Sequence, residues 1–161
     1  MTLERDNFIA EIDKIHVPED AGEYQVGLEE ILNRIPSGWG RWIRLDKGWY
    51  PLVVDLDQKL SKVDPDYKVK QVKEKLAGLR YYFSTNENSY PEMTTLVLDA
   101  ERRSFTICES CGNEGQLCMR NGSHWYKTLC NVCAKEQNYI SYQPDAEDDR
   151  FSDTMESDQL P

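Results

Sequence analysis

Cys108-Glu-Ser-Cys111 and Cys130-Asn-Val-Cys133 are two cysteine pairs that decide how the C-terminal part of this 161-residue chain folds. The two-residue gap within each pair lets both thiolates face one metal ion from a tight turn. Gly112, directly after the first pair, permits the close backbone approach that such a turn needs. The 18 residues between the pairs suit a single site. The spacing therefore predicts one tetrahedral zinc site with all four cysteines as ligands.

Two short strands are predicted between the pairs, at residues 116–120 and 124–129, because Asn121-Gly122 is a strong hairpin-turn signal. Good helix formers at residues 134–137 place Cys133 near the start of a short helix. A zinc ribbon and a treble-clef-like knuckle both fit this pattern. Four thiolates leave no coordination position for water or substrate, so we expect the zinc to be structural.

Cys118 and His124 lie between the pairs and are within reach of the metal along the chain. Either would be surplus in a site that four thiolates already close. Cys118 also fits the role of a small buried apolar residue, and His124 that of a polar residue beside the hairpin turn. The sequence leaves open whether either touches the metal.

Upstream of the cysteines, apolar residues return at helical spacing in four places, near residues 8–15, 28–35, 50–63 and 90–103. Residues 67–73 and 79–83 read as two strands, with Ala77-Gly78 in their connection. This order predicts an α+β fold, in which helices pack on a small antiparallel sheet and a C-terminal zinc ribbon-like module follows.

Acidic residues concentrate at the two ends of the chain, whose net charge is −10. Residues 1–35 carry −6, residues 36–142 carry +2 and residues 143–161 carry −6. We predict four parts: an acidic helical extension at 1–36, an α+β core at 37–105, a zinc-binding module at 106–142 and a disordered acidic tail at 143–161. The tail fits a role in solubility and also a contact with a basic partner.

The cysteine content fits a reducing compartment, because an odd number of cysteines with metal-type pairing is not a disulfide scaffold. The polar, acidic stretch Met1 to Asp6 does not resemble the start of a signal peptide. No apolar stretch has the length that spans a bilayer. We therefore expect a cytoplasmic protein, in the host cytoplasm if it is phage-encoded, with no membrane partner.

A resemblance to a family rests on four motifs: Gly48-Trp49-Tyr50-Pro51-Leu52, Val69-Lys70-Gln71-Val72-Lys73-Glu74-Lys75, Gly78-Leu79-Arg80-Tyr81-Tyr82 and Cys108-Glu-Ser-Cys111-Gly112. With them the chain resembles a family of uncharacterised small proteins of bacteria and their phages, over roughly residues 48–133. The resemblance implies a helix, a hairpin, a second helix and a two-knuckle metal module, and a bacterial or phage origin. It carries over no catalytic residue.

Aromatic and basic residues interleave in the middle of the chain, a combination used to stack on bases and contact phosphates. The candidate binding surface comprises Trp39, Arg41, Trp42, Arg44, Lys68, Lys70, Lys73 and Arg80. The alternative is that the tryptophans, Trp49 included, belong to the core, and that the lysines protect a strand edge.

Catalysis is not expected, because the chain has no phosphate-binding glycine loop, no nucleophile elbow and only two histidines, neither in an acid–base constellation. Asp55 and Asp57 lie two residues apart on a predicted helix, so they face different directions and are expected to be solvated surface charges.

Two non-enzymatic functions remain. The first is a zinc-containing interaction protein, a phage-encoded inhibitor or modulator whose acidic ends approach a host protein with a basic surface. The alternative is a nucleic-acid-binding zinc-ribbon regulator that uses the rings and cations of the middle region.

Overall fold

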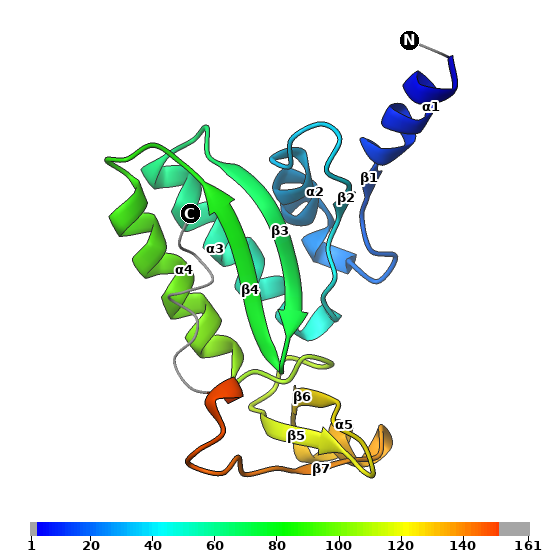
Figure 1. Ribbon diagram of the computed structural model, residues 1–161, viewed down its shortest axis with the longest axis vertical. Coiled ribbons are helices and arrows are strands. Elements are labelled where there is room, and N and C mark those ends of the chain that lie inside the picture. Colours follow the sequence, from blue (N-terminus) through cyan, green and yellow to red (C-terminus); the bar gives the residue numbers. More distant parts are fainter. Residues whose placement is uncertain (1–2, 152–161) are drawn as a thin grey trace.

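The computed structural model describes residues 3–151 and confirms the α+β fold class. The helices are α1 (Leu3–Ile12), α2 (Gln25–Asn33), α3 (Tyr50–Val63), α4 (Tyr90–Ser104) and α5 (Asn131–Glu136). The strands are β1 (Ile15–His16), β2 (Arg41–Trp42), β3 (Lys68–Lys75), β4 (Gly78–Ser84), β5 (Gln116–Arg120), β6 (Tyr126–Leu129) and β7 (Tyr139–Ser141). Figure 1 shows the β3–β4 hairpin beside helices, with a smaller module of β5, β6, β7 and α5 at its lower end.

The β3–β4 hairpin is antiparallel and has a bulge between Val69 and Gln71. The turn residues are Leu76 and Ala77, both with positive φ (51° and 66°), and Gly78 already belongs to β4. The sequence placed the connection at Ala77-Gly78, one residue later. Two central residues with positive φ are typical of the hairpin turns whose twist matches that of the strands.

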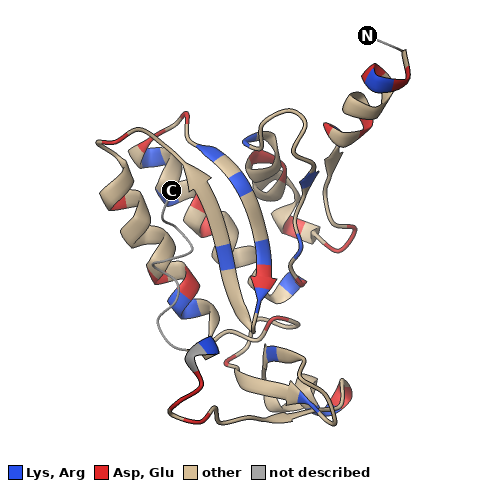
Figure 2. Ribbon diagram, viewed as in Figure 1, with Lys and Arg blue, Asp and Glu red and all other residues tan. Residues whose placement is uncertain are grey.

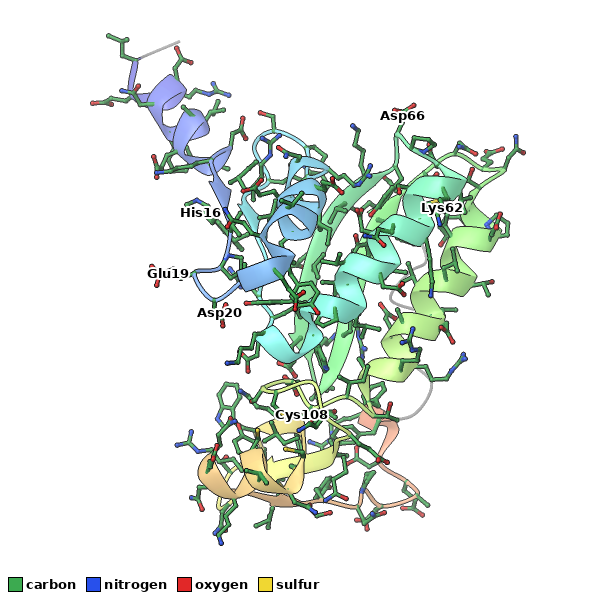
Figure 3. All side chains as sticks on the ribbon, turned by 180° about the vertical axis from the view of Figure 1, so that it is seen from behind. His16, Glu19, Asp20, Lys62, Asp66 and Cys108 are labelled. Atoms are coloured by element: carbon green, nitrogen blue, oxygen red, sulfur yellow. The ribbon has the colours of Figure 1, made fainter. Side chains whose placement is uncertain are left out.

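Three helices, α2, α3 and α4, cover one face of this hairpin, which Figure 3 shows from behind, and their apolar side chains form one buried cluster with those of the hairpin. Three of the four predicted stripes are confirmed, and their buried apolar residues include Leu28, Ile31 and Leu32 of α2; Leu52, Val53, Leu56 and Leu60 of α3; and Met93, Val97 and Ala100 of α4. Ile35 belongs to the same apolar cluster as the buried residues between positions 43 and 100. The predicted boundary at residue 36 therefore does not separate two cores.

Asp57 corrects the expectation that it is a solvated surface charge, since it is only 2% exposed. On α3 it lies four residues after Val53 and three before Leu60, which places it on the inward face. Its Oδ1 accepts a 2.8 Å hydrogen bond from Arg34 Nε and another from the Tyr67 hydroxyl. The Tyr67 and Tyr81 hydroxyls are 2.8 Å apart. The buried carboxylate is thus paired with Arg34, which caps the C-terminal end of α2, and with Tyr67, directly before β3; Tyr81 of β4 contacts the Tyr67 hydroxyl in turn.

The N-terminal helix differs from its predicted form. α1 ends at Ile12, and Ile15 lies in β1, which pairs in parallel with β2. The Asp13 N–H still donates a 2.9 Å hydrogen bond to the Ile9 carbonyl, and just past the helix the Asp13 carboxylate accepts one of 2.7 Å from the Gly38 backbone N–H. None of the side chains of α1 is buried, and Figure 1 shows this helix extending away from the body.

The C-terminal module contains a three-stranded antiparallel sheet in the order β6-β5-β7. β5 coincides with the predicted strand, and Gly122 has the positive φ (82°) expected in the predicted turn. β6 begins at Tyr126, two residues later than predicted, and β7 was not predicted.

The chain after β7 is described as far as Phe151, which falls within the predicted disordered tail. The rings of Phe151 and Tyr142 lie 5.0 and 5.4 Å from that of Tyr126, centroid to centroid. The guanidinium of Arg150 lies 5.3 Å from the same ring. The first part of the predicted tail therefore packs against β6, and residues 152–161 lie outside the described residues.

Candidate metal centre and binding pocket

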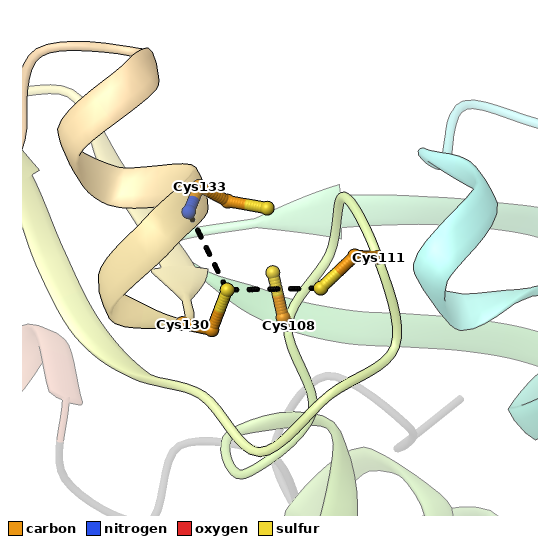
Figure 4. Close-up of side chains that lie close together, drawn as sticks. All are labelled: Cys108, Cys111, Cys130 and Cys133. Carbon is orange, nitrogen blue, oxygen red and sulfur yellow. Dashed lines mark hydrogen bonds between the residues drawn. The ribbon is translucent and has the colours of Figure 1, made fainter.

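The four cysteines of the predicted site come together in the module (Figure 4). Their sulfur atoms all lie within 4.8 Å of one another. A tetrahedron with metal–sulfur bonds of about 2.3 Å has edges of about 3.8 Å, and the Cys111 and Cys130 sulfurs are 3.7 Å apart. The side chains are thus arranged so that they could hold one metal ion.

Each cysteine pair is positioned by its own backbone turn. In the first, the Gly112 N–H donates a 2.9 Å hydrogen bond to the Cys108 carbonyl, and Gly112 has φ +83°, a conformation that favours glycine. In the second, Cys130 caps α5 and its sulfur accepts a 3.4 Å hydrogen bond from the Cys133 N–H. The order of knuckle, hairpin and helix corresponds to the treble-clef-like alternative left open by the sequence.

The surroundings of Cys130 and Cys133 shift the pKa values of their thiols in opposite directions. The Cys133 N–H that donates to Cys130 lowers the pKa of the Cys130 thiol to about 7. Burial and the neighbouring thiols raise the pKa of Cys133. Thiolates are the metal-binding form of cysteine, and a divalent cation would relieve the crowding of charge that opposes ionisation of Cys133.

Cys118 and His124 lie outside the metal-binding group found in residues 3–151. The buried Cys118 sulfur lies 3.4 Å from the Gln116 carbonyl oxygen, within the module's apolar cluster. His124 is exposed beside the hairpin turn. The structure thus favours the non-ligand interpretation of both residues.

The turn of the first cysteine pair contacts the core directly, and Figure 3 places Cys108 at this junction. The Gly48 N–H donates a 2.8 Å hydrogen bond to the Glu109 carbonyl, and the Trp49 indole N–H donates one of 2.8 Å to the Ile107 carbonyl. A Cβ on Gly48 would lie 2.1 Å from the Cys108 carbonyl oxygen. Only a residue without a side chain fits there.

Glu109 is a buried residue of this junction that the sequence did not single out. Its carboxylate accepts a 2.6 Å hydrogen bond from the Thr128 N–H, and the Thr128 hydroxyl donates one of 2.7 Å to the Ala77 carbonyl. Burial, with the nearby charge of Glu74, raises the pKa of Glu109 to about 8. No sequence pattern marks it, because its burial depends on β6 and the β3–β4 turn.

A second feature is a pocket of about 400 Å³ between the segment around β2 and β3–β4. Six aromatic and basic residues line it: Trp39, Trp42, Arg44, Lys70, Lys73 and Tyr82. The candidate surface predicted from the sequence contains the first five and lacks Tyr82. Tyr82 stands between Tyr81 and Phe83, both buried against the helices, so strand alternation directs its ring to the opposite face. That alternation was the signal that could have identified Tyr82.

Main-chain pairing holds the two walls of the pocket together. The Arg44 N–H donates to the Val72 carbonyl and the Glu74 N–H donates to the Arg44 carbonyl, each at 3.2 Å. Arg44 thereby pairs in parallel with Lys73 of β3. Figure 2 shows the basic residues along β3 in blue. The Arg44 guanidinium lies 5.9 Å from the Trp42 ring centroid, and the Lys73 ammonium lies 5.9 Å from that of Tyr82.

Three residues of the predicted surface do not line the pocket. Lys68 is exposed at the start of β3. Arg41 donates hydrogen bonds to the Ile35 and Asp13 carbonyls and holds the N-terminal segment. The assignment of Arg80 to an exposed surface is wrong: it is buried near the hairpin turn and donates to the Leu79 carbonyl.

No protein-family model, curated protein or solved structure matches this chain. The family resemblance drawn from the sequence therefore stays a prediction. In residues 3–151, no helix combines the length and the apolar character that crossing a bilayer requires.

Proposed function

We propose that this protein is a non-enzymatic binding protein whose pocket at Trp39, Trp42, Arg44, Lys70 and Lys73 receives an anionic partner. The observation that carries the proposal is the gathering of three cations around exposed rings in one concave site. Within residues 3–151, Arg44, Lys70 and Lys73 form no ion pair. A ligand that supplies negative charge would complement them.

In this proposal the four cysteines hold a structural Zn²⁺ ion. Support comes from the donor set, since four thiolates in tetrahedral arrangement are typical of structural zinc and leave no open position for chemistry. The ion would fasten the module, whose turn at Cys108 packs against Gly48 of the core.

The binding role is preferred over catalysis because of where the buried titratable groups lie. Asp57 accepts hydrogen bonds from Arg34 and Tyr67 inside the core, and Glu109 is buried at the junction with the module; none of these residues lines the pocket. Such a network stabilises the packing of α2, α3 and the hairpin.

Chromatography on immobilised heparin, a polyanion without bases, tests the proposal. We expect the full chain to be retained at low salt despite its net charge of −10, and the K70E/K73E variant to pass through. The K62E/R102E variant is the matched control, because it reverses two exposed charges on α3 and α4 outside the pocket. Failure of the wild-type chain to bind, or equal retention of both variants, would refute the proposal.

A second candidate function uses the acidic N-terminal segment instead, as a phage-encoded modulator that contacts a basic surface on a host protein in the cytoplasm. The observation that favours it is α1, which buries none of its side chains and leaves Phe8 65% exposed. Aromatic residues, Phe included, are enriched at protein interfaces and commonly serve as their anchors.

Affinity purification from the bacterial host tests this second candidate. The full chain is compared with a variant that lacks residues 1–12, a deletion that removes no core residue among those described. We expect a basic host protein to co-purify with the full chain alone. An identical set of co-purifying proteins would contradict the idea.

A further inference from the structure

We infer that the ligand of the pocket is single-stranded nucleic acid, whose bases stack on Trp39 and Trp42 while its phosphates contact Arg44, Lys70 and Lys73. This inference rests on the proposed function, which requires only an anionic partner, and it names the chemical class of that partner.

The exposed rings point to bases. Trp39 is 58% and Trp42 is 42% exposed, whereas Trp49 is fully buried a few residues further on. An acidic peptide would need the cations of the pocket but not two indole rings beside them. Every base has a flat face that stacks on an aromatic ring, so nucleic acid accounts for rings and cations together.

The backbone around these rings holds Trp42 in place. Gly40 has φ +81°, and a Cβ there would lie 2.9 Å from the Trp42 ring, so this ring packs directly on the glycine. The His16 ring also lies beside the Trp42 ring, with the two centroids 5.8 Å apart. A ring that is supported in this way loses little conformational freedom when a base stacks on it.

The cations lie where a backbone would pass. Lys70 and Lys73 belong to β3, and Arg44 is held beside Lys73 by the parallel pairing described above. All three line the same pocket as the tryptophans. A strand of nucleic acid laid along β3 would therefore bring its phosphates to the cations and its bases to the rings.

The shape of the site favours a single strand. A concave site of about 400 Å³ lies at the low end of the range of roughly 300–1,000 Å³ for ligand pockets. It suits an unpaired base that can be turned toward the rings. In a duplex the bases are already stacked and paired, and removing one from the stack costs free energy.

Fluorescence anisotropy with a labelled oligothymidylate of about 12 nucleotides tests the inference, since small single-strand-binding domains have site sizes in this range. The same sequence as a duplex, and polyglutamate as a competitor, are measured alongside. We expect tighter binding of the single strand than of the duplex and no displacement by polyglutamate. The logarithm of the affinity should fall with the logarithm of the salt concentration with a slope of roughly −2, for three neutralised phosphates.

Two substitutions and one matched control decide whether stacking occurs. Trp39→Ala and Trp42→Ala should each weaken single-strand binding by roughly 5- to 150-fold, the effect of losing one stacked base. Trp125→Ala removes an indole that is 69% exposed at the hairpin of the module, and it should leave the affinity unchanged.

The outcomes separate this inference from the proposed function. Equal binding of duplex and single strand, unchanged affinity of both tryptophan variants, or displacement by polyglutamate overturns the inference. If heparin retains the chain and the oligonucleotide does not bind, the inference fails and the proposed function stands. If neither binds, both fail.

Discussion

The α+β core and the C-terminal module differ in what fills their interiors. The core buries large side chains completely, among them Trp49, Tyr67, Tyr81 and Met93. The module's buried cluster consists of Cys108, Cys118, Leu129, Cys133 and Ala134, of which two belong to the metal-binding group. Small apolar clusters rarely stabilise a fold alone. From this difference we expect that the core folds through apolar burial and that the module needs the proposed metal ion for its stability.

The largest expected effect comes from removing a metal ligand. Cys108→Ser and Cys130→Ser should each abolish stoichiometric zinc and unfold residues 107–139, while the helical core stays folded. The binding free energy of a structural zinc is roughly 10–16 kcal/mol, and in such modules it is folding free energy. Metal analysis and residue-resolved hydrogen exchange measure the two consequences.

Cys118→Ser is the matched control, because it alters a buried cysteine of the same module outside the metal-binding group. It should keep its zinc. Retention of stoichiometric zinc in both ligand variants, or melting of the core with the module, would break the comparison between the two regions.

A smaller loss of stability is expected when a substitution is made in the core and the module is left unchanged. Asp57→Asn removes the charge that pairs with Arg34 and should lower the free energy of unfolding of the core by about 3 kcal/mol, as is typical when a buried pair is broken. Urea denaturation measures this loss, and zinc content should not change.

Asp55→Asn provides the control two residues away. Asp55 forms an exposed ion pair with Lys59 on the same helix, and such pairs contribute about 0.5 kcal/mol or less. Equal effects of the two substitutions would show that the Asp57 network does not stabilise the core.

The smallest expected effect concerns the contact between the core and the module at Gly48. Gly48→Ala places a methyl group 2.1 Å from the Cys108 carbonyl oxygen and 2.5 Å from that of Glu109, and should cost about 2 kcal/mol through forced displacement of the backbone. Thermal unfolding with zinc present should show a lower midpoint for the module, whereas Lys47→Ala, at an exposed neighbour, should match the wild type. An unchanged midpoint would mean that the close contact between Gly48 and the first cysteine turn does not stabilise the module.

The metal-binding group and the helices could be predicted because their signals are local. The cysteine pairs act through short turns, and the apolar stripes of α3 and α4 need only helical periodicity. β7 has three residues and β1 has two. Strands this short form only because a partner strand is already in place, so no pattern in their own residues reveals them.

Burial of polar residues escaped prediction for a related reason. Arg80 alternates with apolar neighbours as an outward strand residue would, yet it is buried near the hairpin turn where the module packs. Asp57 shares an inward helix face with Val53 and Leu60, and its partner Arg34 is 23 residues away. Both depend on contacts between distant segments, as does the approach of Trp39 to Lys73 across the pocket.

The pairing of Arg44 with β3 has a consequence for how this site can change over time. Backbone groups of Arg44, Val72 and Glu74 supply the bonds that join its walls, so exchanging the side chains at positions 42, 44 or 73 leaves the scaffold standing. Such a frame tolerates variation in the side chains that line the pocket. Under the proposed function, ligand preference can therefore drift, or be redesigned, one side chain at a time.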